Sequence, residues 1–270
     1  MSDTTFLDIS ADLETGYRAR VPDGWRQGRT AYGGLTAALC AVAARKDREL
    51  AELRSLMINF TGPVMGDPGF AARVLREGRN VTSMGVDVSI DKDGTATTAG
   101  NALMIFGAAR DSVLDVDCAA PEVSAPENAE PLIPPGGEVF APNFIGNFEI
   151  KLVGGARPMT GAAEGRMLCW VRHRHPGAWN LRGADAEAAF VCLGDALPPA
   201  AFPMMRSPVP ISSVNWTLNL VRAPVSEGGW FLVESEQLAA REGYSSQAMR
   251  YWDREGQLVA QAMQAVAVFG

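Results

Sequence analysis

The sequence predicts an α+β fold in which a unit of one buried helix and several antiparallel strands occurs twice. Three observations support this. The two halves of the chain share a series of short segments, each half holds a stretch of apolar residues suited to a helix, and each half holds strand-like runs. Of the 270 residues, 47% are hydrophobic and 20% are charged, so the chain can form two units with buried cores.

The shared segments follow one another in the same order in both halves. In the first half they are Pro63-Val64, Gly69-Phe70, Asp91-Lys92-Asp93-Gly94 and Ile105-Phe106-Gly107. In the second half they are Pro224-Val225, Gly229-Trp230, Asp253-Arg254-Glu255-Gly256 and Val268-Phe269-Gly270. The spacing between matching segments is nearly constant, which is difficult to obtain by chance. We therefore interpret the chain as an internal duplication.

A segment dense in proline and glycine separates the two copies. Residues 111–140 hold five prolines and a Gly-Gly pair. Because proline has no backbone N–H, such a segment cannot supply the donors of a strand ladder. The sequence therefore predicts an N-terminal unit at residues 1–110, a linker over the surface at residues 111–140 and a C-terminal unit at residues 141–270.

The first unit is expected to form a helix and then strands. Residues 35–44 carry no charge, and Leu35 and Leu39 fall at helical spacing, which predicts a helix surrounded by protein on all sides. At residues 84–90 apolar residues alternate with small or polar ones, the period of a half-buried strand. The Asp-Lys-Asp-Gly sequence at residues 91–94 then predicts a hairpin turn.

The second unit repeats this order. Residues 185–195 predict a helix with Asp185 as its N-cap. Strand-like runs follow at residues 211–221, 230–238, 244–252 and 258–268. One buried helix followed by consecutive antiparallel strands, twice over, is an α+β layout in which the strands curl around the helix.

Composition and charge exclude several classes of function. The net charge of −7 argues against a nucleic-acid partner, since binding a phosphate backbone needs clustered Lys and Arg. The most apolar stretch, residues 31–44, is too short to span a bilayer, and the first residues lack the pattern of a secretory signal. The four cysteines form no CxxC pair, and no nucleotide-binding fingerprint occurs. We therefore expect a cytoplasmic protein without metal, cofactor or membrane partner.

Longer motifs connect the chain to a known family. The first copy carries Tyr32-Gly33-Gly34, Phe60-Thr61-Gly62-Pro63 and Arg76-Glu77-Gly78-Arg79-Asn80, and the second carries Leu193-Gly194-Asp195, Ile211-Ser212-Ser213-Val214-Asn215 and Leu258-Val259-Ala260-Gln261-Ala262-Met263-Gln264. With these motifs the chain resembles the acyl-CoA thioesterase II family of the thioesterase-like superfamily. The resemblance implies a double hotdog, in which each of two tandem hotdog repeats is a long helix wrapped by an antiparallel sheet. It also implies an enzyme of fatty-acid metabolism that hydrolyses acyl-CoA to free acid and CoA, and that could pair as a homodimer.

The catalytic residues are implied by the same resemblance. Matched to the motifs of the family, Asp195, Ser213 and Gln264 together hold and activate the attacking water. Ser213 stands where the family commonly has threonine, and Asn215 stands where it often has aspartate. The first copy has no equivalent trio, which implies one site per chain.

Thioester hydrolysis also suits these residue types chemically. The reaction needs a water that loses a proton as it attacks and donors for the oxygen that becomes negative. The Asp195 carboxylate can accept the proton, while Ser213 and Gln264 can orient the water. At the head of the first helix, amide hydrogens and the helix dipole favour a carbonyl oxygen. The expected substrate-binding residues are therefore Tyr32, Gly33 and Gly34.

Strand periodicity assigns the polar residues to faces. On the last strand, Gln264 shares a face with apolar residues such as Ala262, so its amide needs a partner or a water. Ser213 is expected to share a face with Asn215 and Thr217.

Alternatives to this hypothesis remain open at this point. Taken singly, Asp195 could be a polar helix end, Ser213 a solvated hydroxyl and Gln264 a satisfied core amide. The alternative function is a non-catalytic acyl-CoA-binding or scaffold protein with a vestigial site. An enoyl-CoA hydratase is disfavoured, because its Asp-x-x-x-x-His motif is absent. His173 and His175 lie in a basic run that is expected at a solvated strand end, where it could also meet CoA phosphates.

Overall fold

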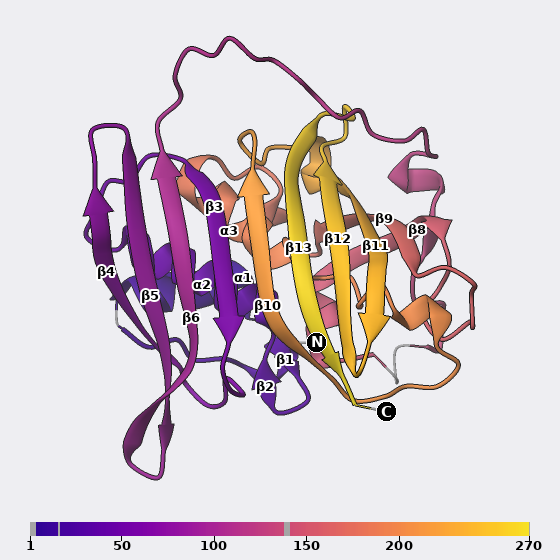
Figure 1. Ribbon diagram of the computed structural model, residues 1–270, viewed down its shortest axis with the longest axis horizontal. Helices are drawn as coiled ribbons and strands as arrows, with labels where there is room; N and C mark the ends of the chain where they lie inside the picture. Colours follow the sequence, from indigo (N-terminus) through magenta and orange to yellow (C-terminus); the bar gives the residue numbers. More distant parts are fainter. Residues whose placement is uncertain (1–3, 16, 138–140, 270) are drawn as a thin grey trace.

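A large sheet and the helices that cover it form two layers (Figure 1). In the computed structural model, which describes residues 4–15, 17–137 and 141–269, eleven strands form one antiparallel sheet and three α-helices lie against one of its faces. The predicted α+β class is confirmed. Parts of three predicted features lie outside the described residues: residues 1–3 of the N-terminal unit, residues 138–140 of the linker and Gly270 of the last repeated segment.

The large sheet contains strands from both halves of the chain. Its members are β3 (Leu53–Phe60), β4 (Gly69–Glu77), β5 (Val81–Lys92), β6 (Thr95–Gly107), β7 (Glu130–Pro131), β8 (Phe148–Gly155), β9 (Arg166–His173), β10 (Ile211–Leu220), β11 (Phe231–Arg241), β12 (Tyr244–Trp252) and β13 (Leu258–Val268). Their spatial order is β4-β5-β6-β3-β10-β13-β12-β11-β9-β8-β7. The four strands predicted in the second half are confirmed as β10 to β13. A separate small sheet pairs β1 (Arg26–Gln27) with β2 (Thr30–Ala31).

The α-helices of the described residues are α1 (Phe6–Thr15), α2 (Gly33–Arg45) and α3 (Gly183–Gly194). Helix α2 is buried on every side along most of its length, as its uncharged sequence predicted. It packs against α3 and is antiparallel to it. Gly34 at the start of α2 lies against the backbone of Cys192 near the end of α3, and Arg45 at the end of α2 contacts Glu187 nearer the start of α3. None of the described helices combines the length and the apolar character needed to cross a membrane.

Helix α3 begins earlier than the sequence predicted. Its N-cap is Arg182, whose side chain makes no capping hydrogen bond, so the assignment of Asp185 as the N-cap is wrong. Gly183 has a φ of +57°, and this left-handed turn directs the chain into the helix before Asp185 is reached. Asp185 lies in the first turn instead, where a carboxylate interacts favourably with the positive end of the helix dipole.

The hairpin between β5 and β6 turns at Asp93 and Gly94, as predicted. Both residues have positive φ, 54° and 79°, as the type I′ turns that match the twist of paired strands require. The N–H of Gly94 donates to the carboxylate of Asp91 at 2.8 Å, which satisfies a donor within the turn.

The pairing of β3 with β10 joins the two halves into one sheet. In this ladder Trp216 lies opposite Ile58, and Leu218 lies opposite Leu56. All four side chains are buried in the main core between the sheet and the helices. The core is therefore continuous across the two halves.

The segment between the halves arcs away from β6 and returns along the far half of the sheet (Figure 1). There it packs against a second apolar cluster, on the face that points away from the helices: Leu168, Trp170, Trp230, Leu232, Trp252 and Leu258. The indole N–H of Trp170 donates to the carbonyl of Ser124 at 2.9 Å, and that of Trp252 donates to the carbonyl of Cys118 at 2.6 Å. The segment also forms the edge strand β7, in which the missing N–H of Pro131 is tolerated because no further strand follows.

Candidate functional site

Three side chains from the second half of the chain meet at the end of α3. Asp195 is the C-cap of α3, Ser213 lies near the start of β10 and Gln264 lies in the middle of β13. The Nε2 amide of Gln264 donates to Oδ1 of Asp195 at 2.9 Å and to Oγ of Ser213 at 3.1 Å. The structure thus brings together the three residues that the sequence singled out, although they lie far apart in the chain.

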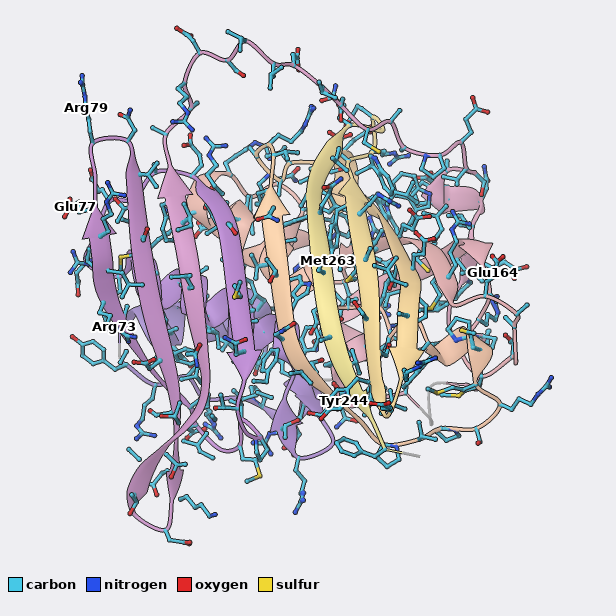
Figure 2. All side chains as sticks on the ribbon, viewed as in Figure 1. Arg73, Glu77, Arg79, Glu164, Tyr244 and Met263 are labelled. Carbon is cyan, nitrogen blue, oxygen red and sulfur yellow. The ribbon has the colours of Figure 1, made fainter. Side chains whose placement is uncertain are left out.

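Gln264 points from the sheet toward the helices. Its neighbour Met263 lies on the opposite face of the sheet and is 48% exposed (Figure 2), whereas Gln264 is 5% exposed. This alternation matches the prediction that Gln264 shares a face with apolar residues such as Ala262. Its amide is therefore buried and depends on partners inside the protein.

Ser213 reaches this face because β10 contains a β-bulge. The register shifts between Ser213, which lies opposite Val266, and Asn215, which lies opposite Ala265. Val214 is the extra residue, and it breaks the strict alternation of the strand. The prediction that Ser213 shares a face with Asn215 and Thr217 is therefore wrong, and the bulge is the reason that its hydroxyl meets Gln264.

The carboxylate of Asp195 lies at the head of α2. The N–H of Gly34 donates a hydrogen bond to this carboxylate. A Cβ atom on Gly33 would lie 2.7 Å from Oδ2 of Asp195 and 3.3 Å from the ring of Phe60. Only glycine therefore lets the backbone of α2 come this close to the carboxylate without displacing its neighbours. The predicted pair of glycines lies beside the predicted acid.

Burial raises the pKa of Asp195 to about 7, although the hydrogen bonds from Gln264 and Gly34 lower it. The residue as a whole is half-buried. The ionisable groups that face it are Tyr32, Cys192 and Tyr251, and burial raises the pKa of all three well above their ordinary values. These neighbours are neutral near pH 7, so Asp195 can exchange a proton close to neutrality.

Two buried tyrosines hold the end of α3 in place. The hydroxyl of Tyr32 donates to the carbonyl of Cys192 at 2.9 Å, and its ring stacks on Phe144 with centroids 4.0 Å apart. The hydroxyl of Tyr251 donates to the carbonyl of Gly194 at 2.7 Å. Both bonds satisfy helix carbonyls that lack intrahelical partners and so fix the cap residue that follows. The side chain of Tyr32 is thus engaged within the protein, and its substrate contact stays a prediction.

A fourth polar side chain, which the sequence analysis missed, extends the cluster. Nε2 of Gln247 on β12 donates to Oε1 of Gln264 at 2.7 Å. Its own Oε1 accepts from the backbone N–H of Ala200 at 2.7 Å. The available signal was a second glutamine at an inward position of a strand, but only the strand register shows that it lies opposite Gln264.

The basic run at residues 172–175 lies apart from this site. His173 is 6% exposed, its Nε2 lies 2.8 Å from the carbonyl oxygen of Ala189, and burial lowers its pKa to about 4. The expectation of a solvated strand end is wrong for His173, because the alternation of β9 turns this side chain into the core. His175 is exposed, as expected.

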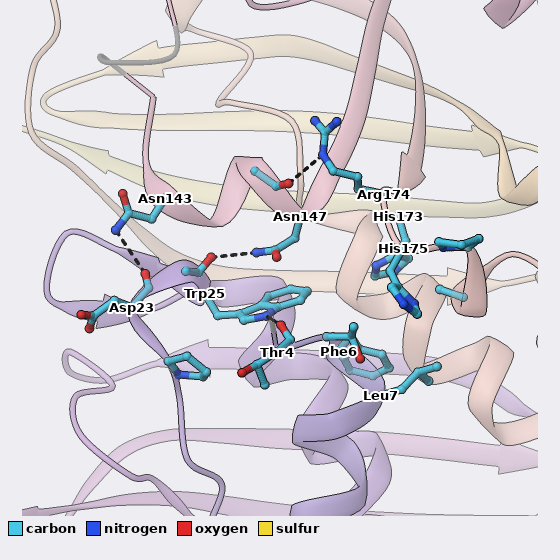
Figure 3. A pocket seen from close by; sticks show the side chains of 16 residues that line it. Thr4, Phe6, Leu7, Asp23, Trp25, Asn143, Asn147, His173, Arg174 and His175 are labelled. Carbon is cyan, nitrogen blue, oxygen red and sulfur yellow. Dashed lines mark hydrogen bonds between the residues drawn. The ribbon is translucent and has the colours of Figure 1, made fainter. Parts of the chain in front are cut away.

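A cavity of about 850 Å³ opens beside this run, between the N-terminal segment and residues 143–147 (Figure 3). Its lining includes Trp25, whose indole N–H donates to the carbonyl of Thr4 at 2.9 Å, and Asn147, which donates to the carbonyl of Gly24 at 2.7 Å. None of the trio lines this cavity. The trio and this cavity are therefore separate features of the described residues.

The trio combines one acid with two neutral hydrogen-bonding groups. Within the described ranges, no three His, Cys, Asp or Glu side chains gather as the ligands of a metal ion would. The carboxylate has more acceptor positions than its two donors occupy, and the hydroxyl of Ser213 retains its own proton to donate. These groups can bind and polarise a water molecule.

Known structures resemble nearly the whole chain. A conserved hotdog-fold protein of unknown function from Alicyclobacillus acidocaldarius superposes with a TM-score of 0.80 at 20% identity, covering 94% of this chain and 92% of that one. The tesB protein of Mycobacterium avium subspecies paratuberculosis gives 0.75 at 15% identity, covering 98% and 100%. An acyl-CoA thioesterase II of Mycobacterium marinum gives 0.69 at 19% identity, covering 93% and 92%. The shared fold is the hotdog fold.

Comparison by sequence gives the family. A search of curated proteins found no match. The family model of the acyl-CoA thioesterase N-terminal domain matches residues 21–107, and that of the acyl-CoA thioesterase C-terminal domain matches residues 120–268, more than half of the chain. The chain therefore belongs to the acyl-CoA thioesterase family.

Proposed function

We propose that this protein hydrolyses acyl-CoA thioesters to free acid and CoA, and that Asp195, Ser213 and Gln264 activate the attacking water. The observation that carries the proposal is the Gln264 amide, which donates to the carboxylate of Asp195 and to the hydroxyl of Ser213 at once. Membership of the acyl-CoA thioesterase family supports the substrate class.

The chemistry requires one base and one oxyanion donor. Asp195, with a pKa of about 7, accepts a proton from water as its oxygen adds to the thioester carbonyl carbon. The N–H of Gly33 at the head of α2 is the proposed donor for the developing oxyanion, since the N–H of Gly34 is already bonded to Asp195. The tetrahedral intermediate then collapses with cleavage of the C–S bond, and protonated Asp195 returns its proton to the thiolate.

We also propose that the two halves form a double hotdog. The support is the sheet register on either side of the β3–β10 junction. In the first half Leu56, Met104 and Met84 form one inward row across β3, β6 and β5, and in the second half Trp216, Gln264 and Gln247 form one inward row across β10, β13 and β12. Gln264 and Gln247 of the second half thus correspond to Met104 and Met84 of the first half. This difference supports one catalytic site per chain.

A thiol-release assay tests the proposed activity. Catalytic amounts of protein are mixed with acyl-CoA substrates of increasing chain length, and free CoA is measured with dithiobis-nitrobenzoate. We expect release by the wild type and loss of at least about a hundredfold in kcat for Asp195→Asn, which removes the base. Asp185→Asn is the matched control, because it removes an exposed carboxylate from the other end of the same helix.

The same experiment separates hydrolysis from binding alone. Hydrolysis at the wild-type rate by Asp195→Asn contradicts the assignment of the base. If the wild type cleaves no acyl-CoA but binds one tightly in calorimetry, the protein is an acyl-CoA-binding or scaffold protein instead.

A further inference from the structure

We propose that Gln247 is a positioning residue for the reaction: it fixes the amide of Gln264 in the orientation that presents the NH2 group to Asp195 and Ser213. The inference rests on the proposed function and extends it to a residue outside the trio. Within the described residues, the side chain of Gln247 makes no hydrogen bond to Asp195 or Ser213. Its effect therefore passes through Gln264.

The need for such a residue follows from the symmetry of a side-chain amide. The oxygen and the nitrogen of Gln264 have nearly the same shape, so rotation by half a turn would exchange donor and acceptor. While Asp195 is ionised, it favours the NH2 group and opposes the flipped state. Once Asp195 has accepted a proton from water, it can itself donate, and that preference is lost. The orientation of Gln264 must then be held from its other end.

Gln247 supplies this second constraint. Its Nε2 lies 2.7 Å from Oε1 of Gln264, so the correct orientation gives a donor-to-acceptor contact and the flipped one would set two NH2 groups against each other. Gln247 is in turn oriented by the backbone N–H of Ala200, which lies 2.7 Å from its Oε1. A backbone N–H can only donate. The sequence of donors from Ala200 through Gln247 and Gln264 to Asp195 therefore has a fixed direction.

The burial of this pair supports a role beyond packing. Gln247 is 1% exposed and Gln264 is 5% exposed, so both amides have left water. In the corresponding row of the first half, Met84 and Met104 fill the same inward positions of β5 and β6. Methionine is close to glutamine in size, and there it packs without any polar partner. The packing of the sheet therefore does not require two amides at this place. Holding the NH2 group of Gln264 in one orientation does require the second amide.

Kinetics of Gln247→Met test the proposal. This variant keeps the volume and copies the residue of the first half, but it cannot donate to Gln264. We expect kcat to fall about ten- to a hundredfold with KM nearly unchanged, because misorientation of a catalytic group acts on the reacting geometry. We also expect the rising limb of the pH profile to move to higher pH, since Gln264 can then turn its oxygen toward protonated Asp195 and stabilise the neutral form of this residue.

Ser245→Ala is the matched control. It removes another hydrogen bond of β12, from the buried Ser245 to Oε1 of the half-buried Gln237 at 2.8 Å, and leaves the hydrogen bonds between Ala200, Gln247 and Gln264 intact. A purely structural role for Gln247 would lower the thermal midpoint in both variants without moving the pH profile. A kcat and a pH midpoint for Gln247→Met that equal those of the wild type overturn the proposal.

A second variant and a second measurement keep the test decisive if Gln247→Met does not fold. In Gln247→Glu, the protonated carboxyl can still accept from Ala200 and donate to Gln264, but the ionised carboxylate cannot donate. Its activity relative to wild type should therefore fall with rising pH, and a constant ratio would contradict the inference. If the wild type hydrolyses nothing, the proposed function fails. A 13C NMR titration of the Asp195 carboxyl group then still tests the positioning role. The pKa of Asp195 rises in Gln247→Met if the orientation of Gln264 is lost, and it stays unchanged if the orientation is kept.

Discussion

Asp195 combines a buried carboxyl group with neutral neighbours, and this environment makes the stability of the protein depend on pH. Burial raises its pKa in the folded protein to about 7, whereas the unfolded chain has an ordinary pKa of 3.8. Between these values the folded state binds the extra proton, so the free energy of unfolding falls as pH rises from about 4 to about 7. At about 1.4 kcal/mol per unit of pKa, the loss is on the order of 4 kcal/mol.

Asp195→Asn removes this titration while keeping the shape of the side chain. We expect the variant to become more stable relative to the wild type as pH increases through this window. Urea unfolding at several pH values between about 4 and 8 measures the difference. A difference that is independent of pH would show that Asp195 ionises normally in the folded protein.

Gly33 is the residue whose missing side chain leaves room for the carboxylate. In Gly33→Ala the new Cβ would lie 2.7 Å from Oδ2 of Asp195, so the carboxylate must move. We expect kcat to fall by about tenfold or more, because a displacement of this size disturbs the reacting geometry. Stability should change by no more than about 1 kcal/mol, since alanine favours a helix over glycine and offsets part of the strain.

Gly146→Ala is the control for this substitution. A Cβ at Gly146 would meet no atom within 4 Å, and the position lies outside the site. Equal activities of the two variants would show that the close approach of Gly33 to Asp195 has no role in the reaction.

Residue types were easier to predict from the sequence than residue orientations. Asp195, Ser213 and Gln264 were found because each carries a group that thioester hydrolysis needs and each falls on a motif of the family. The inward position of Ser213 was not predictable, because the bulge at Val214 depends on pairing with β13. Gln247 was missed for the same reason: its contact with Gln264 depends on the register of two strands, which periodicity does not give.

At the scale of elements, a buried ion pair links the two central helices. Glu187 on α3 pairs with Arg45 at the end of α2 and also accepts the backbone N–H of Leu53 on β3 at 3.0 Å. The carboxylate is thus tied to one helix and one strand of the first half. Removing one member of such a pair leaves the other charge buried and unpaired.

We expect Glu187→Ala to lower the free energy of unfolding by about 3 to 5 kcal/mol. Replacing both charges, as in Arg45→Met with Glu187→Met, should restore a large part of this loss, because two apolar side chains leave no unpaired charge. Urea unfolding of Arg45→Met, Glu187→Met and the double variant gives the coupling energy between the two positions. Additive losses would mean that the two side chains act independently.

Helices and strands could be predicted where the pattern that indicates them lies in consecutive residues. The uncharged stretch at the head of the first half could only be a buried helix, and α2 is buried on all sides. The start of α3 was misplaced because Arg182 serves as its N-cap with no side-chain bond, and a cap of this kind leaves no mark in the sequence. The burial of His173 was hidden by the basic residues around it, since the alternation of β9 outweighs the charge of its neighbours.

At the scale of the whole molecule, the sequence predicts a duplicated unit but not the junction between the two halves. Repeated segments indicate that a unit occurs twice, whereas the pairing of β3 with β10 is set by packing between distant parts of the chain. The junction places Leu56 and Leu218 in one core and brings α2 against α3. The halves therefore share the interactions that stabilise them.

This shared core predicts that the protein unfolds as one cooperative unit. Five of its six tryptophans lie in the second half, so fluorescence reports mainly on that half, while far-UV circular dichroism reports on both. Met84 is buried on β5, away from the junction, and Met84→Ala should cost about 2 to 5 kcal/mol. If the halves are coupled, this substitution shifts the urea transition by the same amount in both signals.

Leu103→Ala is the control. Leu103 lies on the adjacent strand with its side chain 42% exposed on the outer face, so this substitution should shift neither transition by much. A fluorescence transition that stays in place while the dichroism splits into two steps would mean that the halves fold separately, and that the ladder between β3 and β10 does not couple them.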